Sequence, residues 1–178
     1  TPNRQEPHVT SIYVAGIAMT VFGRHPERSL EDLAGEALIR ALADAGCTAP
    51  QIGVAYYSGM TNGTLQGQIS IPGQVIFSKI GIEGIPVYNV ENACASGSSA
   101  FNLAVQSLKA GTADVALAIG AEKMNIPDKA KAFAIFEGGW DVSRAEANAA
   151  VLLKMGEGIT PPHGSESDKP YSKFMAIY

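Results

Sequence analysis

One cysteine lies where an apolar, strand-like run gives way to a long helical pattern. Cys94 stands within the stretch NVENACASGSSAFNLAVQSLKAG, residues 89–111. If residues 85–90 form a strand and a helix begins near Ala95, the thiol lies at the helix N-terminus. Free backbone N–H groups and the helix dipole stabilise an anion there. Because the thiolate is the nucleophilic form of cysteine, the position favours a nucleophile.

The residues around Cys94 are small. Alanine, serine and glycine on both sides would let a large substrate reach the sulfur, so Ser96 and Gly97 are candidate pocket residues. Backbone N–H groups in such a turn could also approach a developing oxyanion. The alternative is a structural cysteine, buried in a tightly packed turn between strand and helix.

Strand-like and helix-like patterns alternate along the first two thirds of the chain. The clearest helix is SLEDLAGEALIRALADAG, where Ser29 can cap the start and Gly46 can end it. Alternation of this kind implies crossover connections and a mostly parallel sheet. The predicted strands are residues 9–20, 52–60, 85–90 and 113–124, and the predicted helices are residues 29–46, 72–79 and 96–109. The sequence therefore predicts an α/β fold.

The pattern changes after Met124. Residues 1–124 are predicted to form the α/β domain, and residues 125–178 an excursion of loops and helices that covers one end of the sheet. The excursion has a helical pattern at residues 143–155 and no clear strand. Since the chain stops on the apolar run KFMAIY, we expect it to be incomplete at its C-terminus.

A specific motif joins these observations. Cys94-Ala95-Ser96-Gly97 opens a helix of small residues, and a hydrophobic strand then ends in G-x-E-x-M at Gly120, Glu122 and Met124. Residues 90–124 resemble the nucleophile segment of the thiolase superfamily. The first strand and helix also resemble that family's first βα unit, and the tail KPYSKFMAIY is similar to the sterol-carrier-type branch. The resemblance covers the N-terminal half of such a protein and implies half of its layered α-β-α sandwich.

The resemblance implies a chemistry. Thiolases make or break carbon–carbon bonds between acyl-coenzyme A units through an acyl-cysteine intermediate, so Cys94 would attack the thioester carbonyl. Met124 resembles a residue that lines the family's active-site floor, although a core methionine is an alternative. Many thiolases carry Asn where this chain has Glu91, whose carboxylate would oppose thiolate formation if it pointed at the sulfur. Coenzyme A thioester is the expected substrate, with no metal and no tightly bound cofactor.

The resemblance also shows what these residues do not supply. In the family, the activating histidine and the second acid–base group come largely from a second, similar half of the chain. His8, His25 and His163 lie in no matching motif. We therefore expect these 178 residues to be inactive alone, and to need further chain or a complementary subunit. Related enzymes pair through strands near the nucleophile, so residues 85–92 are the candidate strand for a homodimer.

Two other interpretations stay open. One is a β-ketoacyl synthase-type condensing enzyme that takes acyl groups from a carrier protein. The other is a non-catalytic or partner-dependent thiolase-fold subunit, including the aldolase type. The CASG turn and the GAEKM strand end favour a thiolase-like acyltransferase over the synthase.

Composition excludes several classes of protein. A net charge of −4 with no basic stripe argues against a nucleic-acid binder. No apolar run approaches the ~18 residues of a membrane span. Cys47, which follows the helix-ending Gly46, is interpreted as structural or incidental. Two cysteines form no disulfide framework, so both thiols are predicted to be free and the protein to be cytoplasmic.

Overall fold

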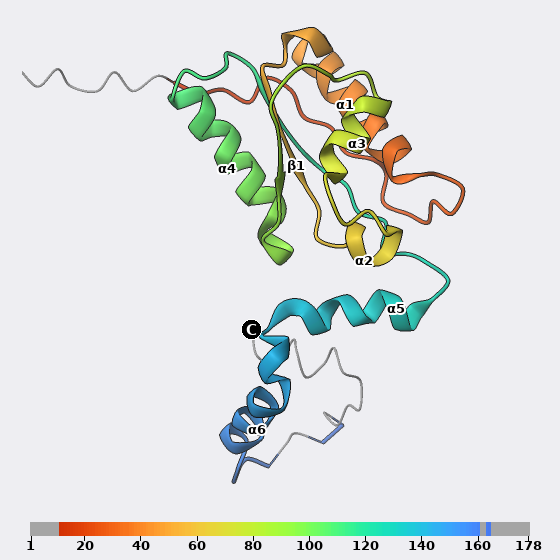
Figure 1. Ribbon diagram of the computed structural model, residues 1–178, viewed down its shortest axis with the longest axis vertical. Coiled ribbons are helices and arrows are strands. Elements are labelled where there is room, and N and C mark those ends of the chain that lie inside the picture. Colours follow the sequence, from red (N-terminus) through yellow and green to blue (C-terminus); the bar gives the residue numbers. More distant parts are fainter. Residues whose placement is uncertain (1–10, 161–162, 165–178) are drawn as a thin grey trace, which may run out of the picture. The chain divides into compact units, whose positions relative to one another are not determined.

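The computed structural model describes residues 11–160 and 163–164 (Figure 1). The chain divides into two compact units, one ending at Asn125 and the other beginning at Ile126. Each unit is described by itself. Within the described residues, no helix is long and apolar enough to cross a membrane.

A three-stranded parallel sheet lies at the centre of the first unit. Its strands are β1 (Val54–Ser58), β2 (Val87–Val90) and β3 (Ala116–Gly120), in the order β2-β1-β3. Ala55 of β1 pairs with Val87 on one side and with Leu117 on the other. Every residue of β1 is buried, as expected for the central strand of a parallel sheet. The predicted mostly parallel α/β fold is confirmed, and three of the four predicted strands are present.

Helices cover both faces of this sheet. Figure 1 shows α1 (Leu30–Ala45) and α3 (Pro72–Lys79) on one side of β1 and α4 (Ser96–Lys109) on the other. A short helix that the sequence did not predict, α2 (Asn62–Gln66), follows β1.

The alternation of side chains along β1 builds two separate cores. Ala55 and Tyr57 belong to a cluster with residues of α1 and α3, whereas Val54 and Tyr56 belong to a cluster with residues of α4. Successive side chains of a strand point to opposite faces, so one strand serves both layers.

Local signals determine the ends of α1. The Ser29 side chain accepts a hydrogen bond from the Asp32 N–H, and the Asp32 carboxylate accepts one from the Ser29 N–H, which completes a capping box. Gly46 ends the helix at φ 63°, a left-handed conformation that favours glycine. Both ends lie where the sequence predicts them.

The strand predicted at residues 9–20 is wrong for the part that the structure describes. Residues 11–20 form no strand and lie against α1 instead. The Ile17 N–H donates to Asp44 Oδ2 at 2.8 Å, and Arg40 donates to the Met19 carbonyl oxygen at 2.9 Å. A Cβ on Gly16 would lie 2.4 Å from the Ala41 carbonyl oxygen, so glycine permits this close approach. Side chains of α1 therefore bind two backbone groups, the Ile17 N–H and the Met19 carbonyl oxygen, that a neighbouring strand would otherwise bind.

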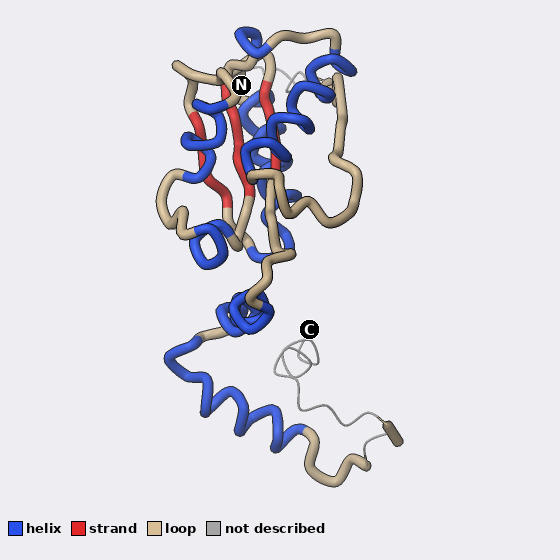
Figure 2. The backbone as a smooth tube through the Cα atoms, turned by 90° about the vertical axis from the view of Figure 1, so that its right-hand side faces the viewer, coloured by secondary structure: helices blue, strands red, loops and turns tan. Residues whose placement is uncertain are grey.

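The second unit is helical in its described part. It contains α5 (Lys129–Ala134), two short 3₁₀ turns and α6 (Ala145–Met155), which confirms the helix predicted at residues 143–155 (Figure 2). Its described residues include no strand, in agreement with the sequence. That residues 125–178 cover one end of the sheet stays a prediction. The tail at residues 169–178 and His8 lie outside the described residues.

Candidate active site

Cys94 lies in a turn between β2 and α4. Residues Ala93–Ala95 form one 3₁₀ turn that leads directly into α4 at Ser96. Because the three strands are parallel, the residues that follow β1, β2 and β3 all lie at one edge of the sheet. Cys94 is exposed, so it is not the buried cysteine of the alternative interpretation. The sequence correctly predicted its place at the helix N-terminus.

Ser96 holds this turn together. Its Oγ donates to the Ala93 carbonyl oxygen at 2.7 Å and accepts the Asn92 N–H at 2.9 Å. Asn92 in turn donates from Nδ2 to Ser99 Oγ at 3.0 Å, which ties the turn to the first coil of α4. Ser96 is buried, and its hydroxyl is used within the turn.

The backbone of the turn is strained just before the thiol. Ala93 has φ 46°, a left-handed conformation that costs a residue with a Cβ about 1–2 kcal/mol. Such conformations persist where surrounding contacts hold them, and they are concentrated at functional sites. The contacts of Ser96 and Asn92 supply that support.

Glu91 turns toward the backbone. Its Oε1 accepts the Ala93 N–H at 2.6 Å, and no hydrogen bond to the Cys94 sulfur is found among the described residues. The Asn92 N–H is bound by Ser96, and the Ala95 N–H by the Asn92 carbonyl oxygen. Within the described part of the chain, the Cys94 N–H has no acceptor. One free donor therefore lies on the same residue as the thiol.

The other predicted pocket residues lie in open surroundings. A Cβ added to Gly97 would meet no atom within 4 Å. Met124 is 37% exposed, so the alternative of a core methionine is wrong, and it follows β3 at the same edge of the sheet as Cys94. Whether Ser96, Gly97 or Met124 contacts a substrate stays a prediction.

The end of β3 ties neighbouring loops together, a role that the sequence did not predict. Glu122 Oε1 accepts the Met60 N–H at 2.6 Å, and Lys123 Nζ donates to the Pro26 carbonyl oxygen at 2.9 Å. The Tyr57 hydroxyl lies 2.8 Å from the Ala121 carbonyl oxygen. Burial raises the pKa of Tyr57, so this hydroxyl remains a donor. These contacts fix the edge of the sheet beside which Cys94 lies.

No base is paired with Cys94 in the described part of the chain. The ring of His25 bonds through Nε2 to the Val21 carbonyl oxygen at 2.9 Å, and His163 is exposed in the second unit. The described residues also contain no group of three or more His, Cys, Asp or Glu that could hold a metal ion. Cys47 is half-buried, and both thiols are free, as predicted. The cytoplasmic location inferred from them stays a prediction.

Comparison with known proteins identifies related sequences. Residues 12–156 match the family described as the thiolase N-terminal domain. Sterol carrier protein 2 of Bos taurus is 37% identical over 135 residues, which are 71% of this chain and 24% of that protein. Acetyl-CoA acetyltransferase of Methanocaldococcus jannaschii is 38% identical over 113 residues, 64% of this chain and 29% of that enzyme. Benzoylsuccinyl-CoA thiolase subunit BbsB of Thauera aromatica is 37% identical over 113 residues, 62% of this chain and 28% of that subunit.

A solved structure shares the fold. The crystal structure of 3-oxoacyl-(acyl carrier protein) synthase III from Xanthomonas oryzae pv. oryzae has a TM-score of 0.51 and 20% identity, covering 71% of this chain and 37% of that one. The chain spans about a quarter of the length of the curated relatives it matches.

Proposed function

The chain belongs to the thiolase family, and on this premise we propose that it is the acyl-accepting part of a thiolase-like acyltransferase that uses acyl-coenzyme A thioesters. The observation that carries the proposal is an exposed thiol at the start of α4, at the sheet edge where all three parallel strands end. Ligands of open α/β sheets bind at this carboxyl edge.

The acyl-transfer step uses groups of the turn itself. The Cys94 thiolate attacks the thioester carbonyl carbon, and a new carbon–sulfur bond forms. The bond from that carbon to the coenzyme A sulfur then breaks, and coenzyme A leaves as the thiolate, which takes up a proton. The negative charge on the carbonyl oxygen is stabilised by a backbone N–H, for which the unpartnered Cys94 N–H is our candidate.

We propose that the acid–base groups of the reaction come from outside the described residues. A base must take the thiol proton, and a second group must move the α-proton of the other substrate when a carbon–carbon bond is made or broken. Further chain or a complementary subunit would supply them. BbsB, a relative of similar identity, is itself named as a subunit of a thiolase.

Acyl transfer to Cys94 is tested by mapping the adduct. The complete protein, with its complementary subunit if it has one, is incubated with acetyl-coenzyme A or acetoacetyl-coenzyme A, digested and analysed by mass spectrometry. We expect an acyl group on Cys94 that is absent from Cys94→Ala and present in the matched variant Cys47→Ala. An adduct that survives in Cys94→Ala would contradict the proposal. Acylation from an acyl carrier protein but not from coenzyme A would favour the synthase-type alternative, and no acylation from either donor would favour a non-catalytic subunit.

We further propose that the chain forms at least a homodimer through residues 85–92. β2 is an edge strand, with β1 on one side only, and an unpaired strand edge invites pairing with a second copy. Tyr88 on this edge is 52% exposed and stacks on Tyr56 with ring centroids 5.2 Å apart.

The dimer is tested by light scattering at micromolar concentration. We expect at least twice the mass of one chain. Tyr88→Lys should shift the protein toward monomer, because a charged edge strand resists pairing. The control Tyr13→Lys changes a tyrosine that is exposed elsewhere and should leave the mass unchanged. A monomeric wild type would refute the proposal.

A further inference from the structure

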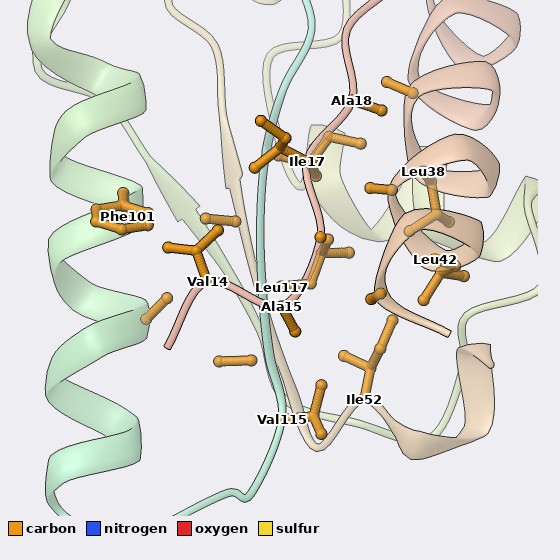
Figure 3. Close-up of a pocket in the computed structure, with 18 of the residues that line it drawn as sticks. Val14, Ala15, Ile17, Ala18, Leu38, Leu42, Ile52, Phe101, Val115 and Leu117 are labelled. Carbon is orange, nitrogen blue, oxygen red and sulfur yellow. The ribbon is translucent and has the colours of Figure 1, made fainter. Parts of the chain in front are cut away.

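A crevice that is open to solvent separates residues 12–20 from β3 in the first unit. Its volume is about 490 Å³, and its wall includes all of residues 12–20 and all of residues 114–122 (Figure 3). Figure 3 shows Phe101 of α4 on one side and Leu38 and Leu42 of α1 on the other. The crevice therefore runs along the whole length of β3, between apolar side chains of two helices.

The edge of β3 that faces the crevice has no strand beside it in the described residues. β1 pairs with the other edge, where the Val115 carbonyl oxygen and the Ala121 N–H make hydrogen bonds to its backbone side. Successive residues of a strand direct their N–H and C=O groups to opposite edges. Because the odd-numbered residues point toward β1, the backbone groups of the even-numbered residues point into the crevice. These are the groups of Ala116, Ala118 and Gly120.

Residues 12–20 present a second unpaired edge to the same crevice. Exposure alternates along residues 15–20 as in a strand, with odd-numbered residues exposed and even-numbered residues half-buried. The Ile17 N–H and the Met19 carbonyl oxygen bond to side chains of α1 that do not line the crevice. The backbone groups of the even-numbered residues therefore face the crevice. Within the described residues, those of Gly16, Ala18 and Thr20 have no hydrogen-bonding partner.

We propose that a β-strand of the same polypeptide, from after residue 164, fills this crevice and pairs with β3 and with residues 12–20. Buried backbone N–H and C=O groups need partners, and an inserted strand offers such groups on both of its edges. An apolar ligand would leave both edges of the crevice unsatisfied. Cys94 does not line the crevice, so the proposal does not depend on acyl transfer.

The order of the strands favours the same chain as the source. Consecutive strands of a chain are neighbours in about two thirds of cases. β3 is the last strand of the described residues, and β1 already occupies its other edge. A following strand that joins β3 must therefore enter the crevice. The chain spans about a quarter of the length of the curated relatives it matches, so these relatives are long enough to contain such a strand.

The walls of the crevice indicate what kind of strand would fit. One face of the strand would meet Phe101 and Leu108 of α4, and the other would meet Leu38 and Leu42 of α1. A strand that is buried on both faces has a continuous apolar run instead of an alternating pattern. Alanines of the wall leave room for its side chains: Ala15, Ala18, Ala41, Ala45, Ala116 and Ala118. We therefore expect an uninterrupted run of about five or six apolar residues.

Amide hydrogen exchange of the complete protein, resolved to single residues, tests whether the crevice is filled. The matched controls are Leu117 and Ile119, whose N–H groups point toward β1 whether or not another strand is present. In a filled crevice, the amides of Ala116 and Ala118 should exchange within about tenfold of the control rates. The Ala18 amide should be slowed in the same way. If Ala116 and Ala118 exchange more than about tenfold faster than the controls, the crevice is open and the proposal is wrong.

Nuclear Overhauser effects between amides of the isotope-labelled complete protein identify the occupant. Ala18 and Ala118 should each show effects to residues numbered above 164. They should show none to each other, because two strands separated by a third lie about 10 Å apart. Direct effects between residues 12–20 and β3 would show that the crevice closes on itself and would overturn the proposal. In a mixture of labelled and unlabelled copies, effects from Ala118 to another molecule would overturn the assignment to the same chain.

Discussion

Removing one hydroxyl tests whether the turn around Cys94 is held as the structure shows. Ser96→Ala deletes the bond to the Ala93 carbonyl oxygen and the bond from the Asn92 N–H. Each hydrogen bond contributes about 0.5–1.5 kcal/mol net. Asn92 and Ala93 are exposed, so water can replace part of what is lost. We therefore expect a loss of about 1–2 kcal/mol of unfolding free energy.

Urea unfolding measures this loss directly. The unfolding free energy falls by about 2 kcal/mol for each molar of urea, so the expected loss lowers the urea midpoint of unfolding by roughly 0.5–1 M. The matched control is Ser98→Ala, because Ser98 Oγ makes one exposed bond to the Ala95 carbonyl oxygen at 2.9 Å. We expect the control to change stability by less than about 0.5 kcal/mol. If the two variants lose the same amount, Ser96 does not hold the turn.

The same variant separates exposure of the thiol from its positioning. In a Cys47→Ser background, alkylation of Cys94 by iodoacetamide needs only an exposed thiol and should stay within about twofold of the unmutated rate. In the proposed mechanism, acylation of the complete protein by acetyl-coenzyme A needs the thiol and the N–H donor in place, and misplacement by about 1 Å can cost up to ~10²-fold. We expect acylation of Ser96→Ala to slow at least tenfold. Equal changes in both rates would refute this reasoning.

Three further predictions concern the core, the pH dependence and the activity. Tyr57→Phe leaves buried Asn62 Oδ1 and the Ala121 carbonyl oxygen without their shared donor, and should cost about 1–3 kcal/mol in urea unfolding; a loss below about 0.5 kcal/mol would contradict it. The Lys79 ammonium beside Glu31 holds the pKa of that carboxyl below its ordinary value, so the stability it contributes is present above about pH 4.3 and is lost as the pH falls through the folded pKa. Glu31→Gln should reduce the loss of unfolding free energy as the pH falls, measured by urea unfolding at several pH values. An unchanged pH dependence of the unfolding free energy would refute the effect. The 178-residue chain should show no turnover of acetoacetyl-coenzyme A with coenzyme A, and a rate near ~10 per second would refute the need for groups from outside it.

The elements predicted best are those with local signals. The ends of α1 follow from residues close in sequence, since Ser29 and Asp32 cap each other and Gly46 adopts the left-handed conformation that stops the helix. The place of Cys94 was predictable for the same reason, because an apolar strand and a small-residue helix flank it directly. The parallel sheet followed from the alternation of such elements.

Residues 11–20 show where this kind of prediction fails. Apolar and β-branched residues indicate that a segment can pack on a core, but not which groups will bind its backbone. Here Asp44, 27 residues away, accepts the Ile17 N–H, and Tyr13 and Ile17 are left 81% and 73% exposed. The bond depends on how α1 lies beside the segment, which no local pattern contains.

The turn at Cys94 was predictable in position but not in its contacts. The sequence raised the question of whether the Glu91 carboxylate would oppose formation of the thiolate. The answer depends on the direction of the Glu91 side chain, which only the three-dimensional structure shows. Glu91 bonds to the Ala93 N–H instead. The left-handed backbone of Ala93 could not be anticipated either, because that conformation is uncommon for alanine.

These contacts together explain how one turn can hold an exposed thiol and yet leave a donor free. The first N–H groups of a helix have no intrahelical acceptor, so each must find another partner. Glu91 takes the Ala93 N–H, Ser96 takes that of Asn92, and the Asn92 carbonyl oxygen takes that of Ala95. The Cys94 N–H alone, within residues 92–95, is left for a ligand. The bond from the Ala93 N–H to Glu91 also helps to keep Ala93 in its left-handed conformation. On this reasoning the Glu91 carboxylate supports the backbone of the turn that carries the thiol.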